Sequence, residues 1–433
     1  MSDLAKFNDF TAILAHLDGL SSFHWDLSLE RIGQVLAQLD LAAPGASAPK
    51  TLAVQVVGTN GKGSTASFLA ALGQAHGLRV GLYTSPHFVS VRERIMVDGR
   101  ALPENEWVAC ANLVWRAGGQ ELTYFEFITA LAVAAFARAG VELGVWEAGL
   151  GGRHDATTVL PVDLVLFTPM SLDHEAVLGS GLAAIAEDKA AALARGRGIR
   201  AAITAGQEPA ALTALQETAA RLGCQLLAPA EMVVYPESVD LGLAGPHQRG
   251  NAHLALAAWH WLAANFSLPN TESGRLSGLR QAFIPGRLQF IPADSARGLP
   301  PLILDGAHNA HGLQALAEAL RHLGVRPAAI IFSALADKDM RLAGEILPGL
   351  TSGPIFIPPV RDNPRAAAPA DLAALFGPRA KPTPDLASAL SLACRLKPAS
   401  LTSPEYPILV CGSLYLLGEF YTLHPEYLEL PSA

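Results

Sequence analysis

Cysteine is scarce in this chain, and the few cysteines that it has lie far apart in the sequence. The four of them, Cys110, Cys224, Cys394 and Cys411, form no C-x-x-C pair. We therefore expect reduced core thiols of a cytoplasmic protein rather than disulfides or metal ligands.

A surplus of positive charge is also absent. The chain carries 31 Lys and Arg residues against 39 Asp and Glu residues, a formal net charge of −8, and no cluster of basic residues stands out. This balance argues against nucleic acid or an anionic membrane as the main partner.

Long apolar runs and a signal sequence are missing as well. No apolar run reaches the roughly 18 residues that a membrane-spanning helix needs. The N-terminal MSDLAKFNDF lacks the basic-then-apolar order of a signal peptide. Half of the 433 residues are nonetheless hydrophobic, which is enough for a large core. Length and composition thus predict a soluble cytoplasmic protein of roughly two to three domains.

What the chain has in quantity is short apolar runs that alternate with helical spacing. This alternation predicts an α/β fold with largely parallel sheets. In the first part of the chain we expect strands at 51–58, 79–85, 141–147, 162–168 and 198–204, and helices at 64–76, 126–139 and 181–195. In the second part we expect strands at 302–305, 328–333, 354–359 and 408–413, and a helix at 312–323.

A stretch rich in proline, glycine and polar residues, 285–301, separates the two series. We place a domain boundary within this stretch, so the predicted domains are residues 1–292 and 293–433. The Pro-rich segments 358–369 and 377–384 are predicted to be surface loops.

The first predicted strand runs into a glycine-rich turn and then into a helix. The turn reads Gly58-Thr59-Asn60-Gly61-Lys62-Gly63-Ser64. Glycines let backbone N–H groups curl around an anion, the helix N-terminus adds favourable potential, and Lys62 supplies a positive charge for a terminal phosphate. The spacing departs from the common G-x-x-x-x-G-K-[ST], because Val56 occupies the first glycine position and Gly63 separates the lysine from the hydroxyl. An ordinary strand-to-helix turn is the alternative, but the lysine favours nucleotide binding.

Further polar residues follow other predicted strands. Ser85 follows the second strand, Glu147 ends the third, and Asp173 and His174 follow the fourth. Carboxyl ends of parallel strands meet at one edge of a sheet, where ligands bind. An oxygen donor such as Glu147 beside a phosphate loop suits Mg²⁺. Alone, Ser85 is more often a turn residue and a histidine is usually structural, while Glu147 is equally interpreted as a solvated strand-end residue. Their common position favours a metal site.

Other polar residues are less distinctive by themselves. Lys189 lies in an expected helix, where residue identity alone favours a solvated lysine. In the second part, Asp305 suits a ribose hydroxyl and Arg287 a phosphate. Helix capping and turn formation are the alternatives for Asn251 and Asp305.

The motifs together resemble the Mur ligase superfamily, and most closely the folylpolyglutamate synthase/dihydrofolate synthase family. The resemblance covers nearly the whole chain and rests on GTNGKGS (58–64), TSPHF (84–88), LTYFE (122–126), EAGLGGRHDAT (147–157), SLDH (171–174), HQRGNAHLAL (247–256), PGRLQ (285–289), DGAHNAHG (305–312) and DKD (337–339). It implies a P-loop central domain with a mostly parallel sheet and a smaller Rossmann-like C-terminal domain.

The resemblance also implies a role for individual residues. Those for ATP are Gly58, Thr59, Asn60, Gly61, Lys62, Gly63, Ser64, Asn251, Arg287 and Asp305. Those for Mg²⁺ are Ser85, Glu147, His174 and Lys189, the last matching a carbamylated lysine of the family, and K⁺ is a further candidate ion. Lys62, Glu147, His174 and Lys189 are the expected catalytic set. Those for the pteroate substrate are Trp25, Asp26, Leu27, Thr123, Tyr124, Phe125, Glu126, His154, Asp155 and Ala156.

Two residue types suit a pterin directly. Tyr124 and Phe125 could wall a flat ring, while Asp26 and Asp155 offer acceptors for its N–H donors. An aromatic-rich helix start that merely packs in the core is the alternative. The sequence departs from the family where its usual DATN reads DATT, with Thr158 in place of asparagine.

The implied activity is ligation of L-glutamate to dihydropteroate and to folate through an acyl phosphate made from ATP. The expected partners are these small molecules, without nucleic acid or membrane, and the expected state is a cytoplasmic monomer. A polyglutamate synthase alone, a related ligase for another carboxylate and a nucleotide-binding regulator without activity are the alternatives. The regulator is disfavoured because Lys62, Glu147, His174 and Lys189 are all present.

Overall fold

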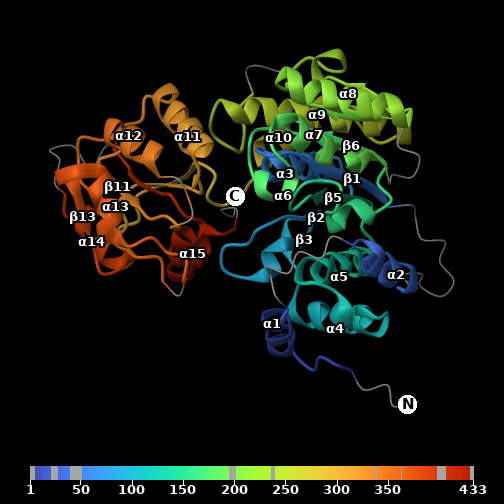
Figure 1. Cartoon of the computed structure of the whole chain (residues 1–433), viewed down its shortest axis with the longest axis horizontal. Coiled ribbons are helices and arrows are strands. Elements are labelled where there is room, and N and C mark those ends of the chain that lie inside the picture. The colour runs from blue at the N-terminus through green and yellow to red at the C-terminus, as the bar shows by residue number, and fades with distance from the viewer. Residues whose placement is uncertain are drawn as a thin grey trace. The chain divides into compact units, whose positions relative to one another are not determined.

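The computed structural model describes residues 5–20, 28–39, 51–194, 201–235, 239–336, 338, 340–361, 363–396 and 406–429. The chain forms two compact units (Figure 1). Unit 1 comprises Met1–His87, Val91–Asp240 and Gly250–Ala282, and unit 2 comprises Phe88–Ser90, Leu241–Arg249 and Phe283–Ala433.

Unit 1 is built on an eight-stranded sheet in the order β4-β3-β2-β5-β1-β6-β7-β8. Strands β2, β5, β1, β6, β7 and β8 run parallel, whereas β3 pairs antiparallel with both β2 and β4. The strands are β1 Leu52–Val57, β2 Val80–Tyr83, β3 Ile95–Val97, β4 Arg100–Ala101, β5 Leu143–Glu147, β6 Leu164–Phe167, β7 Ala201–Thr204 and β8 Gln225–Leu227.

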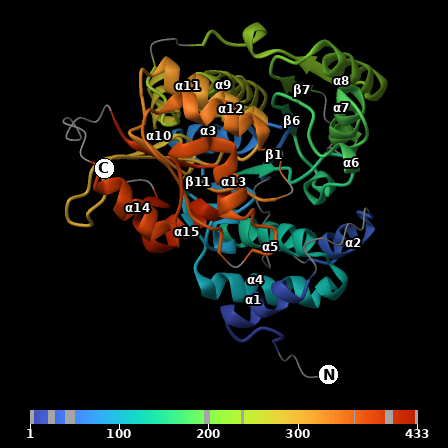
Figure 2. The same cartoon turned by 60° about the vertical axis from the view of Figure 1, so that its left-hand side comes forward.

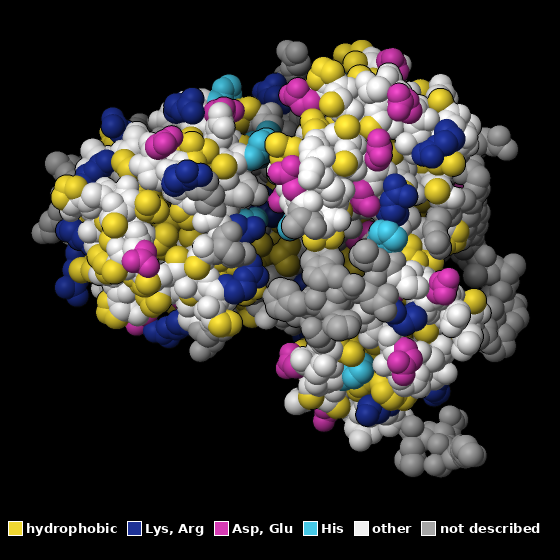
Figure 3. Space-filling model, in the orientation of Figure 1, with side chains coloured by type: hydrophobic (Ala, Val, Ile, Leu, Met, Phe, Trp, Pro, Cys, Tyr) yellow, Lys and Arg dark blue, Asp and Glu magenta, His cyan; other side chains and the backbone are white. Residues whose placement is uncertain are grey.

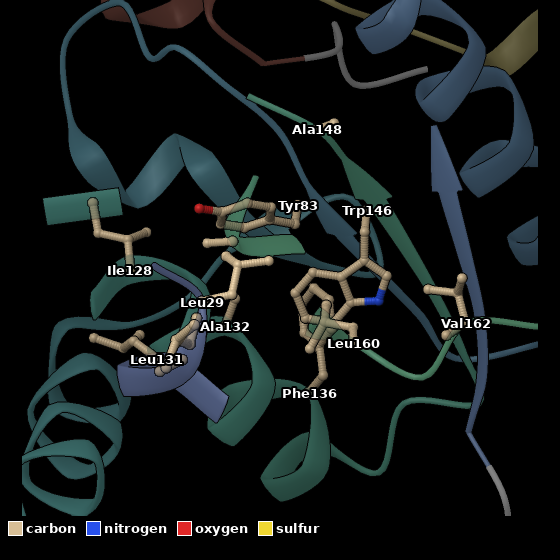
Figure 4. Packing of buried hydrophobic residues seen from close by; sticks show 14 of the residues in the cluster. Leu29, Tyr83, Ile128, Leu131, Ala132, Phe136, Trp146, Ala148, Leu160 and Val162 are labelled. Carbon is tan, nitrogen blue, oxygen red and sulfur yellow. The ribbon is translucent and has the colours of Figure 1, made fainter. Parts of the chain in front are cut away.

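Helices cover both faces of this sheet. On one face, a Cβ atom on Gly73 of α3 would come within 2.9 Å of the side chains of Val80 and Leu143, so the helix packs closely on the sheet. On the other, Phe136 of α5 lies 4.8 Å from Trp146, ring centroid to ring centroid, and Figure 4 shows these rings among further aliphatic side chains. The helices are α1 Phe10–Gly19, α2 Glu30–Gln38, α3 Lys62–Ala75, α4 Glu104–Arg116, α5 Tyr124–Ala139, α6 Glu175–Leu178, α7 Leu182–Ala190, α8 Pro209–Leu222, α9 His247–Phe266 and α10 Glu272–Gln281.

The helices of the α5 face form a small bundle of their own. Both α2 and α4 pack against α5, and α1 packs against α4; Figures 1 and 2 show α1, α4 and α5 side by side. The buried side chain of Asn112 in α4 fixes the segment before α1. It accepts a hydrogen bond from the Phe7 N–H (3.0 Å) and donates to the Phe7 carbonyl (2.8 Å).

Unit 2 contains a six-stranded sheet in the order β13-β12-β11-β14-β10-β9, parallel except for β9. Alternate residues of each strand face opposite layers: Ile303 belongs to one core cluster with α11, α12 and α13, and Leu304 to another with α14 and α15. The elements are β9 Gln289–Ile291, β10 Leu302–Asp305, α11 Ala310–His322, β11 Ala329–Phe332, α12 Arg341–Leu350, β12 Ile355–Ile357, α13 Pro369–Phe376, β13 Ala380–Pro382, α14 Leu386–Cys394, β14 Ile408–Cys411 and α15 Leu414–Leu423.

The expected α/β class with mostly parallel sheets is confirmed, and every expected strand and helix is present with shifts of a few residues at its ends. Two expectations for proline-rich segments need correction. Residues 377–384 are not only a loop, because they contain the edge strand β13, which pairs parallel with β12. Residues 283–292 belong to unit 2, because β9 pairs antiparallel with β10. The boundary expected after residue 292 is therefore too late in the sequence, since unit 2 resumes at Phe283.

The surface and the cysteines agree with the composition. On the face shown in Figure 3, Lys and Arg side chains lie scattered among acidic, polar and hydrophobic ones. The cysteines are free thiols, three of them buried. Within the described part of the chain, no helix is both long enough and apolar enough to cross a bilayer.

The Asn112 contacts predict a measurable effect on stability. Asn112→Ala removes the partner of both backbone groups of the buried Phe7 and should lower the free energy of unfolding by about 2–3 kcal/mol. Urea denaturation followed by circular dichroism measures the change. The matched control is Asn265→Ala, because the Asn265 amide donates to the Trp261 carbonyl at an exposed position. Equal effects of the two substitutions would contradict the role given to Asn112.

Candidate active site

Sheet topology brings four strand ends of unit 1 together. Strands β2, β5, β1 and β6 are neighbours in that order and run parallel. Their carboxyl ends therefore lie along one edge and carry Ser85, Glu147, the Gly58–Ser64 turn and the segment 168–174, as the sequence predicted.

The turn after β1 leads directly into α3. Gly61 adopts the left-handed conformation at the N-cap (φ 84°), and the helix begins at Lys62. The N–H groups of Thr59 and Asn60 both donate to the Pro169 carbonyl at 3.2 Å, so they hold the turn in place. Because the first amides of a helix have no acceptor within it, those of Lys62, Gly63 and Ser64 are the ones suited to a phosphate.

The turn also requires glycine for space. A Cβ atom on Gly58 would collide with the hydroxyl of Thr168, at the end of β6. On Gly61 it would collide with the side-chain amide of Asn251, which places this predicted ATP ligand of α9 against the turn. Glycine at these positions lets β1, β6 and α9 approach one another closely.

Two lysine side chains converge on one carbonyl group of the turn. Nζ of Lys62 donates to the Gly58 carbonyl at 3.2 Å, and Nζ of Lys189 donates to the same oxygen at 2.9 Å. Lys62 also donates to the Thr59 carbonyl at 3.2 Å. Two ammonium groups this close create a region of positive potential, which favours an anion such as a phosphate.

Lys189 is buried, with 3% of its surface exposed. The solvated lysine favoured by residue identity alone is therefore wrong. Burial, and after it the charge of Lys62, lower the pKa of Lys189 to about 8. A lysine with a lowered pKa carries a larger neutral fraction near neutral pH, and the neutral amine is its nucleophilic form.

The loop after β5 holds α7 in place, so it positions Lys189. A Cβ atom on Gly152 would collide with the Lys189 backbone, so only glycine permits this approach. The Gly152 N–H donates to the carboxylate of Asp188 at 3.0 Å, and Asp188 lies 3.7 Å from Arg153.

The predicted metal donors occupy different environments. Glu147 is buried, and its carboxylate accepts the Ser85 N–H at 3.0 Å, which joins the ends of β5 and β2. His174 is half-exposed with a left-handed backbone (φ 53°), and it lies 3.7 Å from Asp173. Among the residues that the structure describes, no group of three or more His, Cys, Asp or Glu could hold a metal.

This donor set fits Mg²⁺ better than a tightly ligated transition metal. Mg²⁺ binds proteins through one or two carboxylates and completes its shell with water and phosphate oxygens. The buried carboxylate of Glu147, next to Ser85 and beside the phosphate turn, has that character. No closed cage of side chains is required.

Ser171 and Gln207, which sequence analysis did not single out as site residues, secure the segment after β6. Ser171 accepts from the side-chain amide of Asn60 at 3.0 Å and exchanges two bonds of 3.2 Å with Thr59. The Gln207 side chain accepts the Met170 N–H and donates to the Thr168 carbonyl. Ser171 belongs to the SLDH motif, whereas no motif points to Gln207.

Two of the predicted pteroate residues, Thr123 and Glu126, make contacts within the protein. Thr123 and Glu126 form a capping box at the start of α5, and the buried Glu126 carboxylate also binds Arg31 of α2 at 3.2 Å. The contacts of Glu126 are therefore internal.

Asp155 has the same character. Its carboxylate accepts four hydrogen bonds, from the N–H groups of Gly149, Leu150 and Thr157 and from the Thr157 hydroxyl. Burial raises the pKa of Asp155, and these hydrogen bonds oppose that rise. In this structure the Asp155 carboxylate therefore orders its own loop, and its contact with a pterin N–H stays a prediction.

The remaining predicted pteroate residues differ in exposure, and three of them lie outside the described residues. Tyr124 and Phe125 are partly buried at the start of α5, His154 is exposed, and Ala156 is buried. The ring of Phe125 lies against Gly149, where a Cβ atom would come within 2.7 Å of it. Trp25, Asp26 and Leu27 lie outside the described residues, as do Asp337 and Asp339 of the DKD motif.

Unit 2 places the other predicted ATP residues together. Asp305, at the end of β10, accepts the N–H groups of Leu288 and Ala307, both at 2.8 Å. Burial raises the pKa of Asp305, and the charge of Arg287 opposes the rise. Arg287 crosses close over Gly306 and donates to the Gly286 carbonyl at 3.3 Å.

Comparison with known proteins gives this site a context. A family model described as "Mur ligase, glutamate ligase domain" matches residues 286–414. Folylpolyglutamate synthase of Lacticaseibacillus casei is 32% identical over 391 residues, 84% of this chain and 87% of that protein. The dihydrofolate synthase/folylpolyglutamate synthase of Bacillus subtilis is 34% identical over 340 residues, 72% of this chain and 76% of that protein.

Solved structures agree over nearly the full length. Mycobacterium tuberculosis folylpolyglutamate synthase complexed with ADP has a TM-score of 0.83 at 28% identity and covers 100% of both chains. E. coli FolC in complex with DHPP and ADP has a TM-score of 0.81 at 29% identity, covering 98% of this chain and 99% of that one. The Yersinia pestis bifunctional folylpolyglutamate synthase/dihydrofolate synthase complexed with AMPPNP and Mn ion has a TM-score of 0.81 at 29% identity, covering 97% and 99%.

The sequence identity to these relatives over most of the chain, the shared α/β fold and the ordered motifs together identify the family. This chain belongs to the folylpolyglutamate synthase/dihydrofolate synthase family of Mur-type ligases.

Proposed function

We propose that this chain is an ATP-dependent ligase that joins the amine of L-glutamate to the carboxylate of dihydropteroate, giving dihydrofolate, and to reduced folates, giving folylpolyglutamates. The observation that carries the proposal is the convergence of Lys62 and Lys189 on the phosphate turn. The names of the relatives and the ADP and DHPP complexes of similar structures support it.

The chemistry explains why such a site is needed. A carboxylate is a poor acylating agent, so one of its oxygens attacks the γ-phosphorus of ATP, ADP leaves, and an acyl phosphate forms. The glutamate nitrogen then attacks the acyl carbon, loses a proton and displaces inorganic phosphate. Charge on the transferring phosphoryl group must be neutralised in the first step, which the Lys62 ammonium can do from the helix N-terminus.

Mg²⁺ is the proposed metal cofactor, in keeping with the Mn ion bound by a similar structure. Ser85, Glu147, His174 and a carbamate on Lys189 would hold it, and bound there it would supply further charge neutralisation on the phosphates. The carbamate is proposed because a free ammonium group repels a metal cation. The neutral amine fraction of the buried Lys189 is the form that adds CO₂.

The residues proposed to contact ATP are the turn Gly58–Ser64, Asn251, Arg287 and Asp305. Tyr124 and Phe125 are proposed to wall the pterin. A monomeric cytoplasmic enzyme, with K⁺ as an additional ion, completes the proposal.

One assay tests the function directly. The purified protein is incubated with ATP, Mg²⁺ and labelled glutamate, and with either dihydropteroate or a reduced folate as acceptor. Labelled dihydrofolate together with lengthened folates supports the dual activity. Lengthened folates alone would leave only the polyglutamate synthase, and turnover with neither acceptor would contradict the proposal.

Lys62→Ala should reduce turnover by roughly 100-fold or more, because a charge on the transferring phosphoryl group is lost. Initial rates of ADP release measure this effect, and circular dichroism checks the fold. Lys381→Ala is the matched control, since Lys381 is exposed on the edge strand β13. Near-normal rates in folded Lys62→Ala would remove the phosphate-turn assignment.

Lys189→Ala and Lys189→Arg should both lose activity, by about 10- to 100-fold, because neither can form a carbamate. A short carboxylate added to Lys189→Ala should restore part of the rate. Labelling with ¹³C-bicarbonate followed by ¹³C NMR should give a carbamate signal that is absent from both variants. A wild-type spectrum without that signal, at saturating bicarbonate and Mg-nucleotide, would refute the carbamate.

A further inference from the structure

One polar side chain lies inside the central strand β1 of unit 1. This strand reads Leu-Ala-Val-Gln-Val-Val, and all six residues are buried. Gln55 has no exposed surface, and it pairs in register with Trp146 of β5 and Val165 of β6, two members of the apolar core. A buried amide in such a place is costly unless its hydrogen bonds are made.

The Gln55 amide binds two hydroxyl groups of the loop after β5. Its Nε2 donates to the hydroxyl of Thr157 at 2.8 Å and to that of Thr158 at 2.9 Å. Both threonines are buried in the short 3-10 helix Ala156–Val159. The buried Oε1 of Gln55 has no hydrogen-bond partner among the described residues. An apolar side chain would avoid that unsatisfied acceptor, so only the donor side of the amide accounts for a polar residue here.

The Thr157 hydroxyl extends this contact to Asp155. Thr157 donates both its N–H and its hydroxyl to one carboxylate oxygen of Asp155. Because a carboxylate only accepts, the Thr157 hydroxyl must receive its own hydrogen bond from Gln55. The bonds therefore form a chain with one direction, from Gln55 through Thr157 to Asp155. Thr158 reaches Asp155 through its backbone instead, since its N–H donates to the Asp155 carbonyl at 2.9 Å.

Asp155 in turn fixes the start of the loop after β5. Its other carboxylate oxygen accepts the N–H groups of Gly149 at 2.8 Å and Leu150 at 3.0 Å. Gly149 lies against the ring of Phe125, and His154 of the same loop is exposed. The chain of hydrogen bonds thus connects β1 to the loop beside Phe125.

We propose that Gln55 is a positioning residue for the acceptor substrate, acting through Thr157 and Asp155 on the loop after β5. This role rests on the proposed function, in which Phe125 walls the pterin. Gln55 lies inside the sheet, so it does not touch the acceptor itself. Because β1 also leads into the phosphate turn at Gly58, one strand supports both the turn and the acceptor-side loop. The alignment of the acceptor carboxylate with the γ-phosphate depends on that common support.

The test breaks the chain at two points. Gln55→Leu removes the donor, Thr157→Val removes the hydroxyl, and Thr157→Ser keeps it. The matched control is Thr158→Val, since this buried threonine accepts from the same amide but its hydroxyl is not part of the chain to Asp155. Gln55→Leu and Thr157→Val should each raise the KM for dihydropteroate and for a reduced folate about 10-fold, and leave the KM for ATP within about twofold. Thr157→Ser and Thr158→Val should both stay within about twofold of wild type for all substrates.

Two further measurements distinguish a chain from separate contacts. If Gln55 acts through Thr157, the double variant Gln55→Leu/Thr157→Val should be no more impaired than the worse single variant. Hydrogen exchange of the peptide that contains Gly149 and Leu150 reports on the loop without any assay of activity. Exchange there should be about 10-fold faster in Gln55→Leu and unchanged in Thr158→Val.

Several outcomes overturn the proposal. They are an unchanged acceptor KM in folded Gln55→Leu, a Thr158→Val variant as impaired as Thr157→Val, and an equal rise of the KM for ATP and for the acceptors, which marks general destabilisation. If Gln55→Leu does not fold, Thr157→Val and Thr157→Ser decide by the same criteria. Wild-type protein that uses neither acceptor fails the proposed function, and hydrogen exchange then still tests the chain. Active wild type with an unaffected Gln55→Leu fails only the role of Gln55.

Discussion

The Gly58 carbonyl oxygen accepts hydrogen bonds from two ammonium groups, and the candidate site is arranged around this contact. Bringing Lys62 and the buried Lys189 together costs both desolvation and like-charge repulsion, which the lowered pKa of Lys189 reflects. The surrounding fold has to offset that cost. It does so through close backbone approaches that only glycine permits, at Gly58 and at Gly152. A site with this concentration of positive charge suits a polyphosphate.

Several polar residues of the signature motifs stabilise the loops that surround this charge. Asp155 accepts four hydrogen bonds from its own loop, and Glu126 caps α5 while it binds Arg31. Both are buried carboxylates, which are expensive unless fully hydrogen-bonded. Their presence in a motif therefore marks a loop of fixed shape.

Strands buried on both faces were predictable from the sequence, whereas short edge strands were not. Strands such as β1 and β10 were predictable because a strand buried on both faces is a continuous apolar run. Strand β13 was missed because an edge strand of three residues, ending in Pro382, buries too little to impose a pattern. The same holds for β9, which lies in a proline-rich segment and was interpreted as linker. Pairing with a neighbour, rather than local composition, makes these segments strands.

The sequence by itself determined the α/β class, the phosphate turn with Lys62, and the strand-end position of Glu147, because these depend on residues adjacent along the chain. Only the tertiary structure decided that Lys189 is buried beside Lys62 and that the Asp155 carboxylate accepts four hydrogen bonds from its own loop. Those facts depend on contacts between residues distant in sequence, such as Gly58 with Lys189. Residue identity does not reveal burial, and burial decides whether a lysine is a solvated surface charge or a buried group with a shifted pKa.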